Sequence, residues 1–225
     1  MNRTLRFVPD ISLCAQRAEE IFIKEAGLDR EGEKYCSMRE EARLVLGEIL
    51  PEMKPAAAYT YYSDFELNGR ELEVDGEILT CEAFGKIGSD SIRGLWVFAA
   101  TSGFTSEEGG SVLRQVYEDI WGTAFTDAVR ELLLEKMSGD CPVSRSFGPG
   151  FYGMDVSEIR VIAGLTDFDA AGVSLADRSL LMPEKSCAGI VFSVNESYRH
   201  PGSACSYCKG SSRGCNMCYE RLLNK

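Results

Sequence analysis

The order of apolar and polar positions along the chain predicts helices first, strands next, and both again toward the end. Residues 12–26 carry apolar side chains at helical spacing, and Gly27 stands where this helix is expected to end. Residues 35–50 repeat the spacing, and Pro51 follows the last apolar position. Because proline lacks an N–H and clashes with the preceding turn, we expect the second helix to end there.

A longer helical pattern occupies residues 106–136. Thr105 and Glu108 have the spacing of a capping box, so this helix is expected to begin near residue 106. The dipeptide Trp121-Gly122 marks a point where it could break. A shorter helical pattern follows at residues 155–164, with an aspartate at its first position as a candidate cap.

Strand patterns fall between and after these helices. Residues 58–81 contain alternating stretches and two turn signals, Asn68-Gly69 and Asp75-Gly76, which together predict a β meander. Residues 95–100 form a continuous apolar run, which is typical of a buried central strand. Because strands come in runs and helices in runs, the pattern favours α+β, with a twisted antiparallel sheet flanked by helices, over a doubly wound parallel fold. Two further strand-like pieces lie at residues 179–182 and 188–194.

Composition narrows the class of protein. The chain has 225 residues, 44% of them hydrophobic, and a net charge of −11. This charge disfavours nucleic acid or an anionic membrane as a partner, because both are themselves negative. The apolar runs are too short to span a bilayer, and the first residues contain no apolar signal region, so we expect a cytoplasmic protein.

The last part of the chain carries a cluster of cysteines. Cys205, Cys208, Cys215 and Cys218 form two Cys-x-x-Cys pairs separated by six residues. Four thiolates in this pattern predict a closed tetrahedral metal site that orders the segment. Zinc, an iron–sulfur cluster, and redox thiols without metal all remain open, and His200 is interpreted as a surface residue rather than a ligand. We therefore expect one α+β domain over residues 1–198 and a metal-binding tail over residues 199–225.

The other cysteines are scattered singly through the chain. Without a secretion signal, single cysteines are expected to be free thiols, and their mostly apolar surroundings predict that they are buried. These residues are Cys14, Cys36, Cys81, Cys141 and Cys187.

Residues 145–154, with the sequence RSFGPGFYGM, are the strongest candidate for a binding turn. The glycines let a ligand approach the main chain, and the proline stiffens the turn. Three aromatic rings offer faces for stacking, and Arg145 offers a planar fork that suits a carboxylate. Such a turn could hold a small zwitterion with an aromatic ring; the alternative interpretation is a well-packed surface turn.

Residues 145–194 resemble the activation domain of cobalamin-dependent methionine synthase, and more closely the stand-alone reactivation proteins of corrinoid systems. The family carries an Arg-x-x-Pro-Gly-Tyr motif, to which residues 145–152 correspond, and a Pro-x-x-Ser-x-x-Gly signature, which residues 183–189 match. On the preceding helix, Asp127 takes the place of an acidic residue that contacts the ligand. The run departs from the family in two ways: the arginine lies one residue further from Pro-Gly, and a phenylalanine stands where the family has tyrosine.

The resemblance implies a site for S-adenosylmethionine, with Arg145 at the ligand carboxylate and Asp127 at its ammonium or sulfonium group. Backbone groups of the turn would hold the adenosine, and an aromatic ring would pack on it. The full set of residues implied is Asp127, Arg145, Gly148, Pro149, Gly150, Phe151 and Tyr152.

The resemblance also implies an activity and partners. Family members repair an oxidised corrinoid: cob(II)alamin takes one electron and is trapped by methylation from S-adenosylmethionine. The expected function is thus that of a methyltransferase acting on cobalamin carried by a partner, either a methionine synthase or a corrinoid methyltransferase protein. A flavodoxin or ferredoxin would supply the electron. The alternatives are a non-enzymatic module that docks on a corrinoid protein and an iron–sulfur protein that transfers electrons to it.

Overall fold

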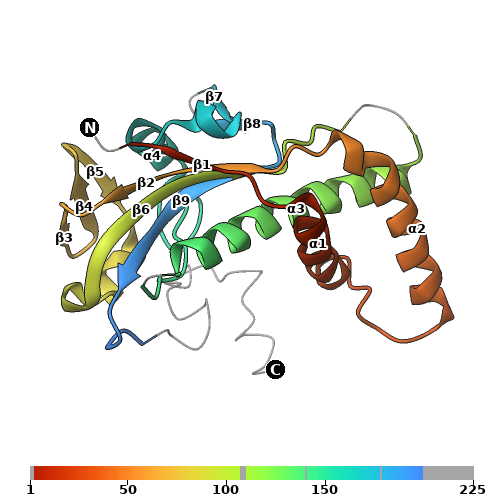
Figure 1. Cartoon of the computed structure of the whole chain (residues 1–225), viewed down its shortest axis with the longest axis horizontal. Helices are drawn as coiled ribbons and strands as arrows, with labels where there is room; N and C mark the ends of the chain where they lie inside the picture. Colours follow the sequence, from red (N-terminus) through yellow and green to blue (C-terminus); the bar gives the residue numbers. More distant parts are fainter. Residues whose placement is uncertain (1–2, 107–109, 140, 178, 200–225) are drawn as a thin grey trace.

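A four-stranded antiparallel sheet separates two layers of the molecule (Figure 1). Its strands follow the order β1-β2-β6-β9, so β1 and β9 form its edges. Their bounds are Leu5–Phe7 for β1, Ala56–Tyr62 for β2, Ile92–Thr101 for β6 and Ser186–Val194 for β9. The computed structural model describes residues 3–106, 110–139, 141–177 and 179–199.

Both faces of this sheet are buried, which explains the continuous apolar runs in its strands. Along β2, Ala57 and Tyr59 pack in the helical layer, whereas Ala56 and Ala58 pack in the opposite layer. Along β6, Phe98 joins the helical layer, and its neighbours on either side join the other. The predicted central strand at residues 95–100 is therefore confirmed, and it extends to ten residues.

One layer consists of three helices, α1 (Ile11–Glu25), α2 (Glu33–Ile49) and α3 (Val112–Met137). Trp121 holds them together: its ring stacks on Phe22 of α1 with centroids 3.9 Å apart, and its Nε1 donates to the Ala42 carbonyl of α2 at 2.9 Å. The two N-terminal helices are confirmed, and Gly27 ends the first in a left-handed conformation with φ 64°.

Helix α3 differs from its prediction in two respects. It begins at Val112, about six residues later than expected, because the Ser111 hydroxyl caps it by accepting from the Arg114 N–H at 3.2 Å. The predicted cap partner Glu108 lies outside the described residues. The helix also runs unbroken through Gly122. That position is buried, and a β-carbon there would stand 2.7 Å from the Lys185 side chain, which explains the glycine.

The second layer is built from short elements. The predicted meander divides: its first part is β2 of the central sheet, and only its later part forms a separate antiparallel sheet. The short helix is confirmed, and Asp155 caps the turn before it by accepting from the Ser157 N–H at 2.8 Å. The elements are β3 (Glu66–Asn68), β4 (Glu71–Val74), β5 (Glu77–Thr80), α4 (Ile159–Leu165), β7 (Ser174–Ala176) and β8 (Leu180–Met182), with 3₁₀ turns at Leu50–Glu52, Glu82–Lys86, Ser89–Ser91, Val156–Glu158 and Phe168–Ala171.

These elements confirm the α+β class and the antiparallel sheet flanked by helices. The boundary at residue 198 and the metal site at Cys205, Cys208, Cys215 and Cys218 stay predictions, since residues 200–225 lie outside the described part. Within that part, no group of three or more His, Cys, Asp or Glu side chains could hold a metal ion. No helix among the described residues has the length and apolar character needed to cross a membrane.

The single cysteines do not all follow their prediction. Cys14 and Cys81 are buried free thiols, as expected, and Cys187 is half-buried. Cys36 and Cys141 are exposed, so for them the prediction was wrong. Cys36 lies in the first turn of α2 on its outer side, and Cys141 follows the end of α3, where no layer covers it.

Candidate functional site

The predicted binding turn is attached to the edge of the central sheet. Before the turn, the chain runs antiparallel to β9: Phe147 N–H donates to the Ile190 carbonyl at 2.9 Å, and the reverse bond is 2.8 Å. Ser144 N–H also donates to the Phe192 carbonyl at 2.8 Å. Phe147 is fully buried, and its ring meets that of Tyr152 edge-on at 5.7 Å. The sheet therefore fixes where the turn begins.

The turn itself needs left-handed backbone angles. Gly150 and Gly153 have φ of 86° and 78°, which glycine adopts at no steric cost. Tyr152 has φ 56°, a conformation that is strained for an aromatic residue. It is held there from outside the turn, because its carbonyl accepts from the Ala83 N–H at 3.2 Å and from the Cys81 thiol at 3.4 Å. Strain of this kind concentrates at binding sites.

A pocket of about 310 Å³ lies between the turn, α3, α4 and the start of β9. Gly148, Pro149, Phe151 and Tyr152, all predicted ligand residues, line it. Gly150 lies within the same turn, but it is not among the lining residues. The remaining wall is formed by Phe98, Arg130, Ser146, Phe147, Val156, Ile159, Ser179, Leu181, Ser186, Cys187 and Ala188.

Close approach of two backbones explains the glycines at Gly148, in the wall, and at Gly189, on the neighbouring strand. A β-carbon at Gly148 would stand 2.9 Å from the Ala188 carbonyl oxygen, and one at Gly189 would stand 2.4 Å from the Phe147 carbonyl oxygen. Both distances are shorter than packing allows, so any other residue would push the turn away from β9. The glycine that ends the 183–189 signature thus has a physical reason to be where it is.

The predicted acid and the predicted arginine lie outside the pocket wall. Asp127 projects from α3 and pairs with Arg130, whose Nη2 lies 2.9 Å from its Oδ1. Burial raises the pKa of Asp127, the Arg130 charge lowers it, and Glu131 raises it again. Arg145 is half-buried, and its Nε is fully buried without a hydrogen-bond partner. Neither Asp127 nor Arg145 is a lining residue.

Sequence reasoning missed the charged residue and the thiol of the lining, Arg130 and Cys187. Arg130 is the one charged side chain among the described lining residues, and its position three residues after Asp127 on a helix was the available signal. Cys187 also lines the pocket, and burial raises the pKa of its thiol to about 11, against a smaller lowering by Arg130. Cys187 had been predicted only as a buried thiol, since nothing in a lone cysteine indicates a pocket.

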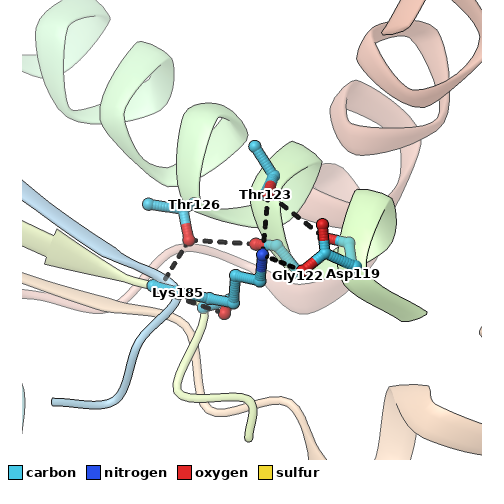
Figure 2. A network of polar contacts seen from close by, with 6 residues as sticks. Asp119, Gly122, Thr123, Thr126 and Lys185 are labelled. Atoms are coloured by element: carbon cyan, nitrogen blue, oxygen red, sulfur yellow. Dashed lines mark hydrogen bonds and ion pairs between the residues drawn. The ribbon is translucent and has the colours of Figure 1, made fainter. Parts of the chain in front are cut away.

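The loop before β9 is clamped onto α3 (Figure 2). The Lys185 carbonyl accepts from the Thr126 hydroxyl at 2.7 Å, and Ser102 N–H donates to the same oxygen at 3.1 Å. The Lys185 side chain points along the helix to Asp119, with Nζ 2.5 Å from Oδ1, and to Thr123 at 3.2 Å. These contacts set the distance between α3, which carries Arg130, and the strand that forms the opposite wall of the pocket.

Comparisons with known proteins agree with this architecture. No family model matches the chain, and no curated protein matches it in sequence. Among solved structures, the chain resembles the crystal structure of the MetH reactivation domain bound to S-adenosylhomocysteine (AdoHcy), with a TM-score of 0.62 and 14% identity. The match covers 88% of this chain and 80% of that one. The chain therefore has the fold of that reactivation domain, as the sequence motifs predicted.

Proposed function

We propose that this protein binds S-adenosylmethionine in the pocket beside residues 148–152 and serves as a reactivation protein for a corrinoid carried by a partner. Two separate observations support this proposal most strongly. The turn that the motif singles out forms one wall of the pocket, and the fold is that of a domain whose structure contains AdoHcy.

The chemistry of the wall suits this ligand. A volume of about 310 Å³ lies at the lower end of roughly 300–1,000 Å³ for small-molecule pockets. Phe151 and Tyr152 offer ring faces for the adenine, and the glycine backbone of the turn can approach the ribose closely. Gly150, Asp127 and Arg145 stay part of the proposed set as residues beside the pocket: Gly150 shapes the turn, and neither Asp127 nor Arg145 lines the pocket.

The proposed reaction requires little covalent chemistry from this chain. A low-potential donor would supply one electron to a cobalt(II) corrinoid on the partner, and the methyl carbon would bond to the reduced cobalt as its bond to sulfur breaks. AdoHcy would remain in the pocket. The task of the residues around the pocket is then to bind the ligand and to orient its methyl group, because the nucleophile belongs to the partner's cofactor.

Phe151→Ala tests the pocket assignment. The Phe151 side chain is 67% exposed and lines the pocket, so its removal should leave the fold intact. Loss of stacking on adenine, worth about 1–3 kcal/mol per base, should weaken AdoHcy binding by about 5- to 150-fold. Calorimetric titration of the full-length protein with AdoHcy measures this change.

Ile78→Ala is the matched control, because Ile78 is 54% exposed on β5 and is not among the pocket residues. It should bind AdoHcy as the wild type does. Wild-type protein that gives no heat with AdoHcy, even in the presence of the corrinoid partner, would refute the proposed function and favour a docking module. Equal weakening by both variants would refute the location of the site.

A further inference from the structure

Arg130 is in a position to make ligand contacts that the sequence motif assigned to other residues. Among the described residues that line the pocket, Arg130 alone carries a charge. Its Nη2 pairs with Asp127 at 2.9 Å. Its Nε is fully buried and has no hydrogen-bond partner. A buried donor without an acceptor costs free energy, so the hydrogen-bonding capacity of this guanidinium is not met within the described residues.

Asp127 fixes the arginine from behind. The two residues lie three positions apart on α3, so their side chains meet on the same helix face. The neighbouring acid Glu131 forms its ion pair with Arg17 of α1 instead, at 2.9 Å. One edge of the Arg130 fork is thus occupied by a carboxylate, and the remaining N–H groups are left for a second anion.

The other described lining residues offer no charge for an anionic ligand group. They are apolar side chains, one glycine, a proline, a tyrosine, a cysteine and three serines, Ser146, Ser179 and Ser186. Arg145 also has a buried Nε without a partner, but it does not line the pocket. Of the two arginines, Arg130 is therefore the one that is placed to contact a ligand in the pocket.

We propose that Arg130 binds the carboxylate of the ligand's amino-acid part, and that Asp127 is a positioning residue that orients the Arg130 guanidinium. This inference rests on the proposed function, because it concerns the same ligand. It changes the assignment that the motif implied, in which Arg145 met the carboxylate and Asp127 met the ammonium group.

Two ligands that differ in the carboxylate separate these assignments. AdoHcy carries the amino-acid part, and 5′-methylthioadenosine keeps the adenosine and the thioether but lacks it. Arg130→Met should weaken AdoHcy by about ten- to a hundredfold, as expected for a charge-assisted hydrogen bond, and should change methylthioadenosine binding by less than about twofold. Arg130→Lys, which keeps the charge and loses the fork, should weaken AdoHcy by a smaller factor.

The positioning role of Asp127 is tested in the same titrations. Asp127→Asn should weaken AdoHcy and leave methylthioadenosine unchanged. In the Arg130→Met background it should have no further effect, because Asp127 acts through Arg130. Additive losses in the double variant would contradict this role and support direct contact between Asp127 and the ligand ammonium.

Arg43→Met is the control, since Arg43 pairs with Glu19 on the exposed side of the helical layer. It should bind both ligands as the wild type does. Arg130 variants that keep full preference for AdoHcy, or that lose both ligands equally, would overturn the inference, as would loss of that preference in Arg145→Met alone. Wild-type protein that binds neither ligand would instead refute the proposed function, so the two failures are distinguishable.

Discussion

At the scale of single residues, the pocket combines a strained turn with buried polar groups. Tyr152 adopts left-handed backbone angles, and Arg130 keeps a buried Nε without a partner. Each feature costs stability on its own, and each lies on the same pocket. Cys187 adds a third group, a thiol near the start of β9 whose pKa is raised by burial, so that it stays neutral. Its reactivity is a direct probe of the pocket.

The thiol of Cys187 should alkylate slowly and with a distinctive pH dependence. With a pKa of about 11, its thiolate fraction at pH 7 is roughly one in ten thousand. Iodoacetamide should therefore modify Cys187 more than about a hundredfold more slowly than the exposed Cys141. Between pH 8.5 and 9.5 the Cys187 rate should rise about tenfold, whereas that of an ordinary exposed thiol approaches its plateau.

Peptide mass spectrometry of the alkylated protein measures both rates in one sample. Saturating AdoHcy should slow Cys187 further and leave Cys141 unchanged. A Cys187 rate equal to that of Cys141 at neutral pH would contradict the burial of this thiol in the pocket wall.

The sequence indicated which residues lie together where the geometry is local, and it did not where the residues come from separate elements. The glycines, the proline and the aromatic rings of residues 148–152 lie in one turn, so their grouping was visible in the sequence, and four of these five residues line the pocket. Arg130 and Cys187 come from a helix and a strand that only the folded chain brings together. The same limit applies to Asp127, whose link to the pocket through Arg130 depends on side-chain pairing.

At the scale of elements, the contact between α3 and the loop before β9 sets the width of the site. It has two parts, one through the Lys185 backbone and one through its side chain. The carbonyl part is buried and includes Thr126, which is 6% exposed. The side-chain part ends on Asp119, whose carboxylate is 69% exposed. The buried part should therefore carry more of the stability.

Thr126→Val should lower the free energy of unfolding by about 1–2 kcal/mol, because it removes the hydroxyl that donates to the Lys185 carbonyl. Lys185→Met keeps the carbonyl and most of the stem, loses the ion pair to the exposed Asp119 and the hydrogen bond to Thr123, and should cost less than about 1 kcal/mol. Urea denaturation of both variants gives the comparison. A larger cost for Lys185→Met would mean that the side chain, and not the buried carbonyl, holds the loop to the helix.

Elements were predicted well where the periodic pattern was long. The helices near residues 12–26 and 35–50 and the apolar strand near residues 95–100 occur close to their expected bounds. The start of α3 was misplaced because two competing caps, Thr105 and Ser111, precede it, and a single sequence does not rank them. The predicted meander proved to be parts of two sheets. Alternation along the chain indicates strands, but it does not specify which strands pair with one another.

At the scale of the whole molecule, the sheet buries both faces and leaves the pocket at its β9 edge, beside the segment that pairs with β9. In the proposed function, a methyl donor bound at this edge would meet an acceptor carried by another protein. The net charge of −11 suits a partner with a basic surface. The class of the fold followed from the sequence; the position of the pocket at the edge required the strand order.

The central claim is that the ligand lies in this pocket, and a crystal structure of the full-length protein with AdoHcy tests it most directly. We predict one AdoHcy per chain, with its adenosine against residues 148–152 and the start of β9. Electron density for AdoHcy elsewhere on the molecule, or an empty pocket in crystals grown at saturating AdoHcy, would contradict the claim.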